Sequence, residues 1–404
     1  MRWEKAKIGD HCEITSSKRI FYSEYTNSGV PFYRSKEIIE SSQGQPISEP
    51  LYISIEKFND IKSKFGVPLP GDMLLTSVGT IGIPYIVRTD DHFYFKDGNL
   101  TWFRNFYDSL SSRFLCYWIG SKEGYGVLNN TTIGSSQKAL TIASLKKLEC
   151  PLPPVEIQER VVDILSAYDD LIENNQKQIK LLEEAAQRLY KEWFVDLRFP
   201  GYENTPIVDG VPEGWEKTIF SARVDILSGG TPKTSNPEYY NGSIPFYSPK
   251  DSDDRFFVFD TETHISESGL DNCNSKLYPE ETIIITARGT VGKTTILAKP
   301  MAMNQSCYAV RSSQVPSVYF LFFALRHEIK ALKTMANGGV FDTIIVKTFD
   351  RINLTTPSGT LMYAFDKQVR PIMEKIKSSL IEIRCLSEAR DRLLPKLMSG
   401  EIEV

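Results

Sequence analysis

The feature that most constrains this 404-residue chain is that it repeats itself once, with its landmarks in the same order. The second half repeats a Trp-Glu-Lys triplet, an apolar-Pro-Phe-Tyr group, a glycine-rich stretch and a pattern along a long helix. The paired groups are Trp3-Glu4-Lys5 with Trp215-Glu216-Lys217, Val30-Pro31-Phe32-Tyr33 with Ile244-Pro245-Phe246-Tyr247, Thr76 to Gly82 with Thr286 to Gly292, and Leu182, Glu184, Ala185, Arg188, Leu189 with Leu386, Glu388, Ala389, Arg392, Leu393. Solenoid repeats are far shorter than this period. The pattern therefore predicts a duplicated globular domain, each copy followed by a long helix, with pseudo-two-fold symmetry.

Composition indicates a globular protein without a strongly basic surface. The hydrophobic fraction is 41% and the formal net charge is −4, so any DNA binding must depend on focused Lys/Arg loops. Six cysteines without a CxxC spacing predict free thiols and a cytoplasmic location. No apolar signal region opens the chain. The longest apolar run, Val318 to Leu325, is too short to span a bilayer and aligns with Phe114 to Ile119, which predicts a core helix of the repeat.

Four segments follow from the distribution of apolar runs, Gly and Pro. We expect a first globular domain at 1–152, a long helix at 153–199, a linker and second globular domain at 200–356, and a second long helix at 357–404. The fold class is α+β: two similar mixed domains and two long helices. Short apolar runs between turn residues predict strands at Met73 to Leu75, Phe93 to Phe95, Ile283 to Ile285 and Thr295 to Leu297.

The first long helix carries a 4-3 apolar spacing typical of a coiled coil. The predicted positions are Ile157, Val161, Ile164, Tyr168, Leu171, Asn175, Gln178, Leu182, Ala185 and Leu189. The second helix has a matching stripe, perturbed by Pro371 and ended or kinked by Pro395. Two such stripes predict an antiparallel coiled coil, because a lone stripe would leave apolar surface in water. The alternative is that each helix packs separately on its own domain. Asn175 and Gln178 either fix the register or face solvent.

One segment resembles a nucleotide-binding loop. Residues Ala287 to Thr294 fit a relaxed Walker A pattern, which would make the chain a P-loop protein. The first copy keeps the glycines but lacks the Lys-Thr pair. The residues after the loop, Thr295 to Pro300, read as a second strand, and a P-loop without its helix loses the dipole that binds phosphate. We therefore expect glycine-rich hairpin turns in both copies.

No catalytic or metal-binding constellation is visible among the four histidines and the carboxylates, so we expect no catalysis, cofactor or metal in this chain. What remains is a set of repeated loops with basic, polar and aromatic residues, whose side chains can bond phosphates and base edges. The candidate DNA-binding residues are Lys18, Arg19, Tyr33, Arg34, Lys36, Ser77, Thr80, Gln137 and Lys138 in the first copy, and Thr231, Lys233, Tyr247, Lys250, Arg288 and Lys293 in the second.

The whole chain resembles the specificity (S) subunits of Type I restriction–modification systems. The motifs that carry the resemblance are Pro212-Glu213-Gly214-Trp215-Glu216, Gly229-Gly230-Thr231-Pro232, the run Leu189 to Asp196, the run Leu393 to Gly400, and Pro153 to Glu159 at the start of the first helix. The second copy departs at that last place, where it has Pro357-Ser358-Gly359.

The resemblance implies a DNA-recognition function without an active site. Each target-recognition domain would read one part of a split, asymmetric double-stranded DNA sequence. The helices would separate the domains and dock two methyltransferase (M) subunits, which restriction (R) subunits join. S-adenosylmethionine, ATP and magnesium would be used by those partners, and no membrane is involved. A purely structural coiled-coil adaptor is a third reading, but it leaves the two aromatic-rich domains with matched basic loops unexplained.

Overall fold

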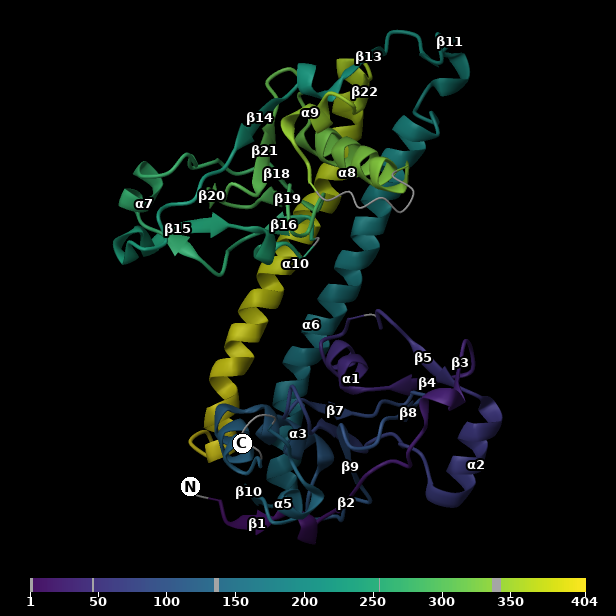
Figure 1. The fold of residues 1–404 in the computed structure, drawn as a ribbon, viewed down its shortest axis with the longest axis vertical. Helices are drawn as coiled ribbons and strands as arrows, with labels where there is room; N and C mark the ends of the chain where they lie inside the picture. The colour runs from purple at the N-terminus through teal and green to yellow at the C-terminus, as the bar shows by residue number, and fades with distance from the viewer. Residues whose placement is uncertain (1–2, 46, 134–137, 254, 336–342) are drawn as a thin grey trace. The chain divides into compact units, whose positions relative to one another are not determined.

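The computed structural model describes residues 3–45, 47–133, 138–253, 255–335 and 343–404. The chain forms two compact units (Figure 1). Unit 1 comprises Met1–Asn174 and Glu382–Val404, and unit 2 comprises Asn175–Ile381. Each unit therefore contains one globular part together with a portion of both long helices.

The globular part of unit 1 contains two four-stranded sheets and one short strand pair. One sheet has the order β2-β9-β6-β7, the other has the order β3-β5-β4-β8, and β1 pairs with β10. The strands are β1 Lys5–Lys7, β2 Glu13–Thr15, β3 Tyr25–Thr26, β4 Val30–Tyr33, β5 Leu51–Ile53, β6 Met73–Thr76, β7 Pro84–Ile86, β8 Tyr94–Phe95, β9 Leu100–Arg104 and β10 Glu149–Pro151.

The globular part of unit 2 repeats this arrangement. Its five-stranded sheet has the order β14-β21-β18-β19-β16, its three-stranded sheet has the order β17-β15-β20, and β13 pairs with β22. The five-stranded sheet has one more strand, β16, than the matching sheet of unit 1, and the pair β11-β12 has no counterpart among the described strands of unit 1. The strands are β11 Ile207–Val208, β12 Val211–Pro212, β13 Glu216–Ile219, β14 Asp225–Ser228, β15 Tyr240–Tyr247, β16 Phe257–Val258, β17 His264–Ile265, β18 Ile283–Thr286, β19 Thr294–Leu297, β20 Ala302–Met303, β21 Cys307–Arg311 and β22 Asn353–Thr356.

The central strands lie where the apolar runs predict them. β6 is buried along its whole length, and so is its counterpart β18. A strand covered on both faces needs continuous apolar residues instead of alternation, which explains why these runs were readable. The matched neighbours keep the same pairing: Met73 faces Phe103 across the β6–β9 pair, and Ile283 faces Val310 across β18–β21.

Helices cover these sheets. The predicted core helices are confirmed, because α3 (Ser112–Gly120) buries Phe114 and Trp118 and α8 (Val318–Met335) buries Phe320 and Leu325. In unit 1 the helix is interrupted: Ser121 accepts a hydrogen bond from the amide of Gly124 and caps a separate helix. The remaining short helices are α1 Ser35–Ser42, α2 Ile55–Phe65, α4 Lys122–Asn130, α5 Ile142–Lys146, α7 Glu267–Asp271 and α9 Val346–Phe349.

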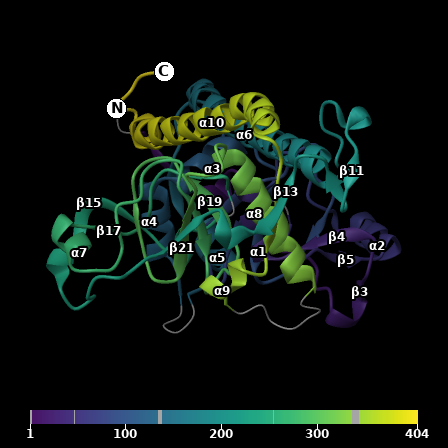
Figure 2. The ribbon, with the colours of Figure 1, turned by 90° about the horizontal axis from the view of Figure 1, so that it is seen from above.

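The two long helices are α6 (Val155–Tyr190) and α10 (Gly359–Ser399). Within unit 1 the first part of α6 lies beside the last part of α10, and within unit 2 the last part of α6 lies beside the first part of α10 (Figures 1 and 2). In unit 1 Arg390 Nη1 donates to Asp169 Oδ1 at 2.6 Å. In unit 2 the ring centroid of Tyr190, the last residue of α6, lies 6.3 Å from that of Phe365 in α10. The predicted antiparallel pairing is therefore confirmed, and each helix also packs on the globular part that precedes it.

Half of the predicted seam is out of register by one residue. The positions Val161 and Asn175 are buried as predicted, but Leu171 is 49% exposed. The buried series that the prediction missed is Gln158, Leu165, Ile172, Ile179 and Ala186, where Ile157, Ile164, Leu171, Gln178 and Ala185 were expected. The cause is adjacent apolar pairs, such as Ile164-Leu165 and Leu171-Ile172, since either member can satisfy a spacing of three or four.

The prediction that Pro395 ends or kinks α10 is wrong as to the end, because the helix continues to Ser399. Proline removes one backbone hydrogen bond near a helix terminus, and Gly400, at φ +71°, provides the actual stop. The linker at the start of residues 200–356 is anchored by Phe199, which directly precedes it and whose ring centroid lies 5.1 Å from that of Trp215.

Candidate nucleic-acid interface

The glycine-rich segments form the same hairpin turn in both units. In unit 1 the amide of Gly82 donates to the carbonyl of Thr76 at 2.8 Å, and the amide of Ile83 donates to Thr76 Oγ1 at 2.9 Å. In unit 2 Gly292 and Lys293 donate to the carbonyl and Oγ1 of Thr286 at 2.8 Å and 3.1 Å. Threonine thus closes each turn with its backbone and its side chain.

The turn in unit 2 shows which conformation the Walker-like residues adopt. Residues Thr294–Leu297 form β19, which pairs antiparallel with β18, so a strand follows the loop. The helix dipole that a P-loop uses to bind phosphate is therefore missing. The ammonium of Lys293 donates to the carbonyl of Ser252 at 3.1 Å. The prediction of a hairpin turn in place of a P-loop is confirmed.

A second segment in each unit follows the apolar-Pro-Phe-Tyr strand, and it is the start of α1 in unit 1 and the turn at Pro249–Asp251 in unit 2. An acidic side chain three residues on caps the turn: Glu37 accepts from the amide of Arg34 at 2.6 Å, and Asp251 accepts from the amide of Ser248 at 2.8 Å. These hydrogen bonds hold the start of the segment, which carries Lys36 in unit 1 and Lys250 in unit 2. Both lysines are exposed. Asp251 has a structural function that the sequence pattern did not reveal.

A third segment, which sequence reasoning missed, joins these loops. In unit 1 the amide of Lys96 donates to the carbonyl of Tyr33 at 2.8 Å, and the carbonyl of Asn99 accepts from the amide of Ser77 at 2.8 Å. In unit 2 the amide of Asn304 donates to the carbonyl of Tyr247 at 2.9 Å, and the carbonyl of Ser306 accepts from the amide of Ala287 at 2.7 Å.

The side chains of this third segment bond to a fourth loop, which contains Arg19 in unit 1 and Thr231 in unit 2. Asp97 Oδ2 accepts from Arg19 Nε at 2.8 Å, whereas Gln305 Oε1 accepts from the hydroxyl of Thr231. In each unit the structure therefore brings together three predicted loops and one segment that was not predicted. The arrangement depends on the parallel pairing of β4 with β8 and of β15 with β20. No local sequence motif indicates that pairing, so the third segment could not be found from the sequence.

In unit 1 the candidate side chains divide by exposure. Lys18, Arg19, Lys36, Thr80 and Lys138 are exposed. Lys18 lies 4.4 Å over the ring of Phe65, Lys36 pairs with Glu49 at 3.0 Å, and Lys138 donates to Asn129 Oδ1 at 3.1 Å. Gln137 lies outside the described residues.

Three other candidates of unit 1 are tied into the scaffold. The hydroxyl of Ser77 is buried and bonds that of Thr101 at 2.7 Å, and Tyr33 stacks on Phe93 at 4.4 Å. Burial raises the pKa of the Tyr33 phenol. Arg34 bonds the fully buried carboxylate of Glu37, and this contact raises the pKa of the guanidinium. These groups position the loops instead of presenting their polar atoms to a ligand.

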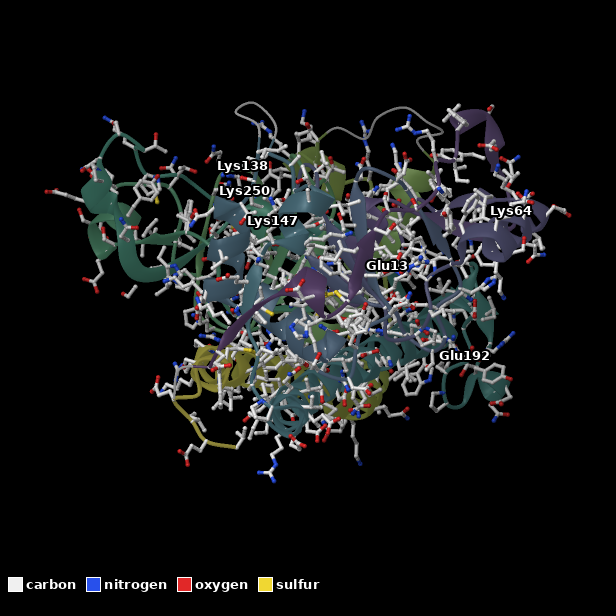
Figure 3. All side chains as sticks on the ribbon, turned by 90° about the horizontal axis from the view of Figure 1, so that it is seen from below. Glu13, Lys64, Lys138, Lys147, Glu192 and Lys250 are labelled. Carbon is white, nitrogen blue, oxygen red and sulfur yellow. The ribbon has the colours of Figure 1, made fainter. Side chains whose placement is uncertain are left out.

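In unit 2 four candidates are exposed: Thr231, Lys233, Lys250 and Arg288. Lys250 and Lys138 are labelled in Figure 3, one in each unit. Tyr247 is only 1% exposed, and burial raises the pKa of its phenol. Its side chain therefore belongs to the core, and Lys293 is half-buried.

Other kinds of site find no support in the part of the chain that the structure describes. No group of three or more His, Cys, Asp and Glu could hold a metal ion among the described residues. No helix within those residues is long and apolar enough to cross a membrane.

Comparison with known proteins adds a family and a fold. Residues 1–184 and 212–382 match the family model of the Type I restriction modification DNA specificity domain. The chain is 28% identical to the Type I restriction enzyme MjaIX specificity subunit of Methanocaldococcus jannaschii, over 100% of this chain and 94% of that protein. It is 30% identical to the HindI specificity subunit of Haemophilus influenzae, over 65% of this chain and 71% of that protein.

A solved structure has the same fold. The S subunit of a Type I restriction–modification system from M. genitalium matches 98% of this chain and 96% of its own, with a TM-score of 0.61 and 16% identity.

Proposed function

The chain belongs to the Type I restriction–modification DNA specificity family, and we propose that it reads a bipartite, asymmetric DNA sequence, one half with each globular part. The observation that supports this most directly is that one loop scaffold occurs twice with different exposed side chains. Lys18 and Arg19 are exposed in one copy and Thr231 and Lys233 in the other, whereas Lys36 and Lys250 keep a lysine at matching positions. One scaffold with two sets of side chains suits two different half-sites.

The chemistry of these loops fits phosphate and base-edge contacts. Lysine and arginine neutralise phosphates and bond the acceptor atoms of guanine in the major groove. Threonine can donate to or accept from either kind of base. In our proposal the buried members of the set, Ser77 and Tyr247, hold the loops and do not touch DNA.

We further propose that the chain is not itself an enzyme and that its long helices dock partner subunits. In this proposal residues 1–152 and 200–356 are the target-recognition domains, and residues 153–199 and 357–404 separate them. Two methyltransferase subunits and the restriction subunits would assemble on this chain. S-adenosylmethionine, ATP and magnesium would act in those partners.

A domain exchange tests independent reading. Residues 1–152 are replaced by the corresponding part of another family member, and the assembled methyltransferase complex is assayed on a randomised DNA library. We expect one half of the methylated sequence to change and the other to stay. The reciprocal exchange of residues 200–356 should change only the other half. A change in both halves, or in neither, would contradict the proposal.

The spacer role has its own test. Inserting one turn into both helices lengthens the pair by about 5.4 Å, so we expect the preferred gap between the half-sites to grow by a base pair or more. Sequencing of the methylated sites in the same library measures that gap. An unchanged gap with unchanged half-sites would show that the helices do not set it.

A further inference from the structure

Each unit holds one pair of hydrogen-bonded side chains that has the same place in both copies and differs in both members. In unit 1 Nε of Arg19 donates to Oδ2 of Asp97 at 2.8 Å. In unit 2 the hydroxyl of Thr231 donates to Oε1 of Gln305. One pair is charged and the other is neutral, although the same two segments carry them.

The strand registers show that the two pairs are equivalent. Ile14 of β2 and Ile226 of β14 hold matching places, because the residue that each of them faces also faces the matched strand β6 or β18. Arg19 follows Ile14 by five residues, and Thr231 follows Ile226 by five. Each acceptor directly follows the residue whose amide bonds the apolar-Pro-Phe-Tyr strand. The pairs are therefore the two versions of one position in the fold.

Two glycines fix Thr231 beside Gln305. A Cβ atom on Gly229 would collide with the carbonyl oxygen of Asn304, and one on Gly230 would lie 2.5 Å from a backbone amide nitrogen. Larger residues would push the loop away from the third segment. The Gly-Gly-Thr-Pro motif therefore serves close packing of the main chain, and the hydroxyl that follows its glycines reaches Gln305.

These pairs differ in kind from the lysines that follow the matched strands. Lys36 and Lys250 keep one residue type in both copies, which suits a phosphate contact because phosphates are the same in every sequence. The position of Arg19 and Asp97 changes in both members, while the main-chain hydrogen bonds on either side of the third segment are kept. Side chains that vary on a constant scaffold suit base edges, which differ between half-sites.

The free donors and acceptors of each pair match one base. The bond to Asp97 uses Nε of Arg19, so the terminal nitrogens of a side chain that is 68% exposed can donate to O6 and N7 of guanine. Gln305 is exposed and gives one lone pair of Oε1 to Thr231. Its second lone pair and its amide hydrogens can then bond N6 and N7 of adenine.

We propose that these are the base-reading pairs of the two globular parts: Arg19 reads a guanine in one half-site, and Gln305 reads an adenine in the other. Asp97 and Thr231 are positioning residues, since each holds its partner before DNA arrives and lowers the entropic cost of a two-bond contact. On the proposed function in DNA recognition, which this assignment presupposes, the two copies read different bases from one equivalent position.

The test uses the assembled methyltransferase complex and a randomised DNA library, from which bound duplexes are recovered and sequenced. Selecting for binding keeps the readout independent of which adenine is methylated. We expect Gln305→Met to lower the preference for one A·T pair in the half-site of unit 2 by about tenfold or more. Arg19→Met should do the same for one G·C pair in the other half-site. The preferences at all remaining positions should stay as in wild type.

Matched controls lie on the lysines that both copies keep. Lys36→Met and Lys250→Met should weaken binding to all sequences alike and leave the preference at each position unchanged. Thr231→Val removes the hydroxyl and keeps the shape of the side chain, so we expect a smaller loss of about threefold at the A·T pair that Gln305→Met affects. All five substituted residues are exposed, and thermal unfolding should stay close to that of wild type.

A lost preference for the other kind of base pair, losses in both half-sites from one variant, or an equal weakening of all sequences would overturn the assignment. The domain exchange separates this failure from a failure of recognition. If the exchange changes one half-site as expected while Gln305→Met and Arg19→Met change no preference, other residues read the bases and the proposed function stands. If the exchange changes neither half-site, both proposals fail.

Discussion

The two globular parts share their backbone contacts and differ in the side chains that these contacts present. The amide of Lys96 donates to Tyr33 as that of Asn304 donates to Tyr247. In contrast, the side chain on the neighbouring position is Asp97 in one copy and Gln305 in the other. A loop that the main chain holds can exchange its side chains at little cost in stability, because the hydrogen bonds that fix it do not involve them.

The two copies also differ in their core helix. Ser121 divides the core helix of unit 1 into α3 and α4, whereas α8 of unit 2 is continuous and carries Lys330 and Lys333. The scaffold is thus common, and the surfaces beside the hairpin are specific to each copy. Four predictions test how far that division holds.

The largest effect should come from the seam of the long helices, where the copies are equivalent. Leu165→Asp and Ile376→Asp each place a charge at a fully buried position, and we expect each to cost about 4 kcal/mol of unfolding free energy or more. Denaturant unfolding followed by circular dichroism measures the loss.

Matched controls lie on the same helices. Leu171→Asp and Ile381→Asp change side chains that are 49% and 45% exposed, and each should cost about 0.5 kcal/mol or less. A large loss of unfolding free energy for Leu171→Asp, with little loss for Leu165→Asp, would support the register predicted from spacing alone. A strong effect in one helix only would break the equivalence of the copies.

The next effect concerns the glycines of the two hairpins. Gly82→Ala and Gly292→Ala introduce a Cβ at φ +82° and +74° and within 2.9 Å and 2.7 Å of a neighbouring side chain. We expect losses of about 2–3 kcal/mol, from backbone strain and from the forced displacement of the helix side chains.

Gly79→Ala and Gly289→Ala are the controls for that pair. They have similar positive φ but no atom closer than 3.5 Å, so only the strain of about 1–2 kcal/mol remains. Thermal unfolding of the four variants separates the two terms. Equal losses at all four positions would mean that contact with the following helix contributes nothing.

Much of this architecture was predictable from sequence because a duplication offers two independent views of each element. The buried runs around Leu74 and Ile284 have no polar alternative and read directly as strands. The seam register was not recoverable, since Ile164 and Leu165 satisfy the spacing equally well. The joining segments containing Asp97 and Gln305 were missed because parallel pairing of β4 with β8 and of β15 with β20 depends on tertiary structure. The burial of Tyr247 was likewise invisible to a search for aromatic residues in loops.

A smaller effect should separate the two exposed lysines that follow the matched strands. The ammonium of Lys36 pairs with Glu49 at 3.0 Å, so a DNA phosphate must compete with that carboxylate. No such pair is recorded for Lys250 among the described residues. We expect Lys250→Ala to lower the salt dependence of DNA binding by the assembled complex by about one unit, and Lys36→Ala to lower it by less. Fluorescence anisotropy across salt concentrations measures both. A larger change at Lys36 would reverse the comparison.

The smallest effect distinguishes the two contacts that hold the fourth loop. Asp97→Ala removes an ion pair with Arg19, whose side chain is 68% exposed, and Gln305→Ala removes a neutral hydrogen bond with Thr231. An exposed ion pair contributes about 0.2–1 kcal/mol and weakens as salt screens it. We therefore expect Asp97→Ala to cost about 0.5 kcal/mol at low salt and less at 0.5 M salt, whereas the cost of Gln305→Ala should not change with salt. Denaturant unfolding at the two ionic strengths, relative to wild type, gives both differences. If salt changed the unfolding free energy of both variants alike, the charge on Asp97 would not contribute to holding its loop. The two copies would then hold this loop by equivalent interactions despite their different side chains.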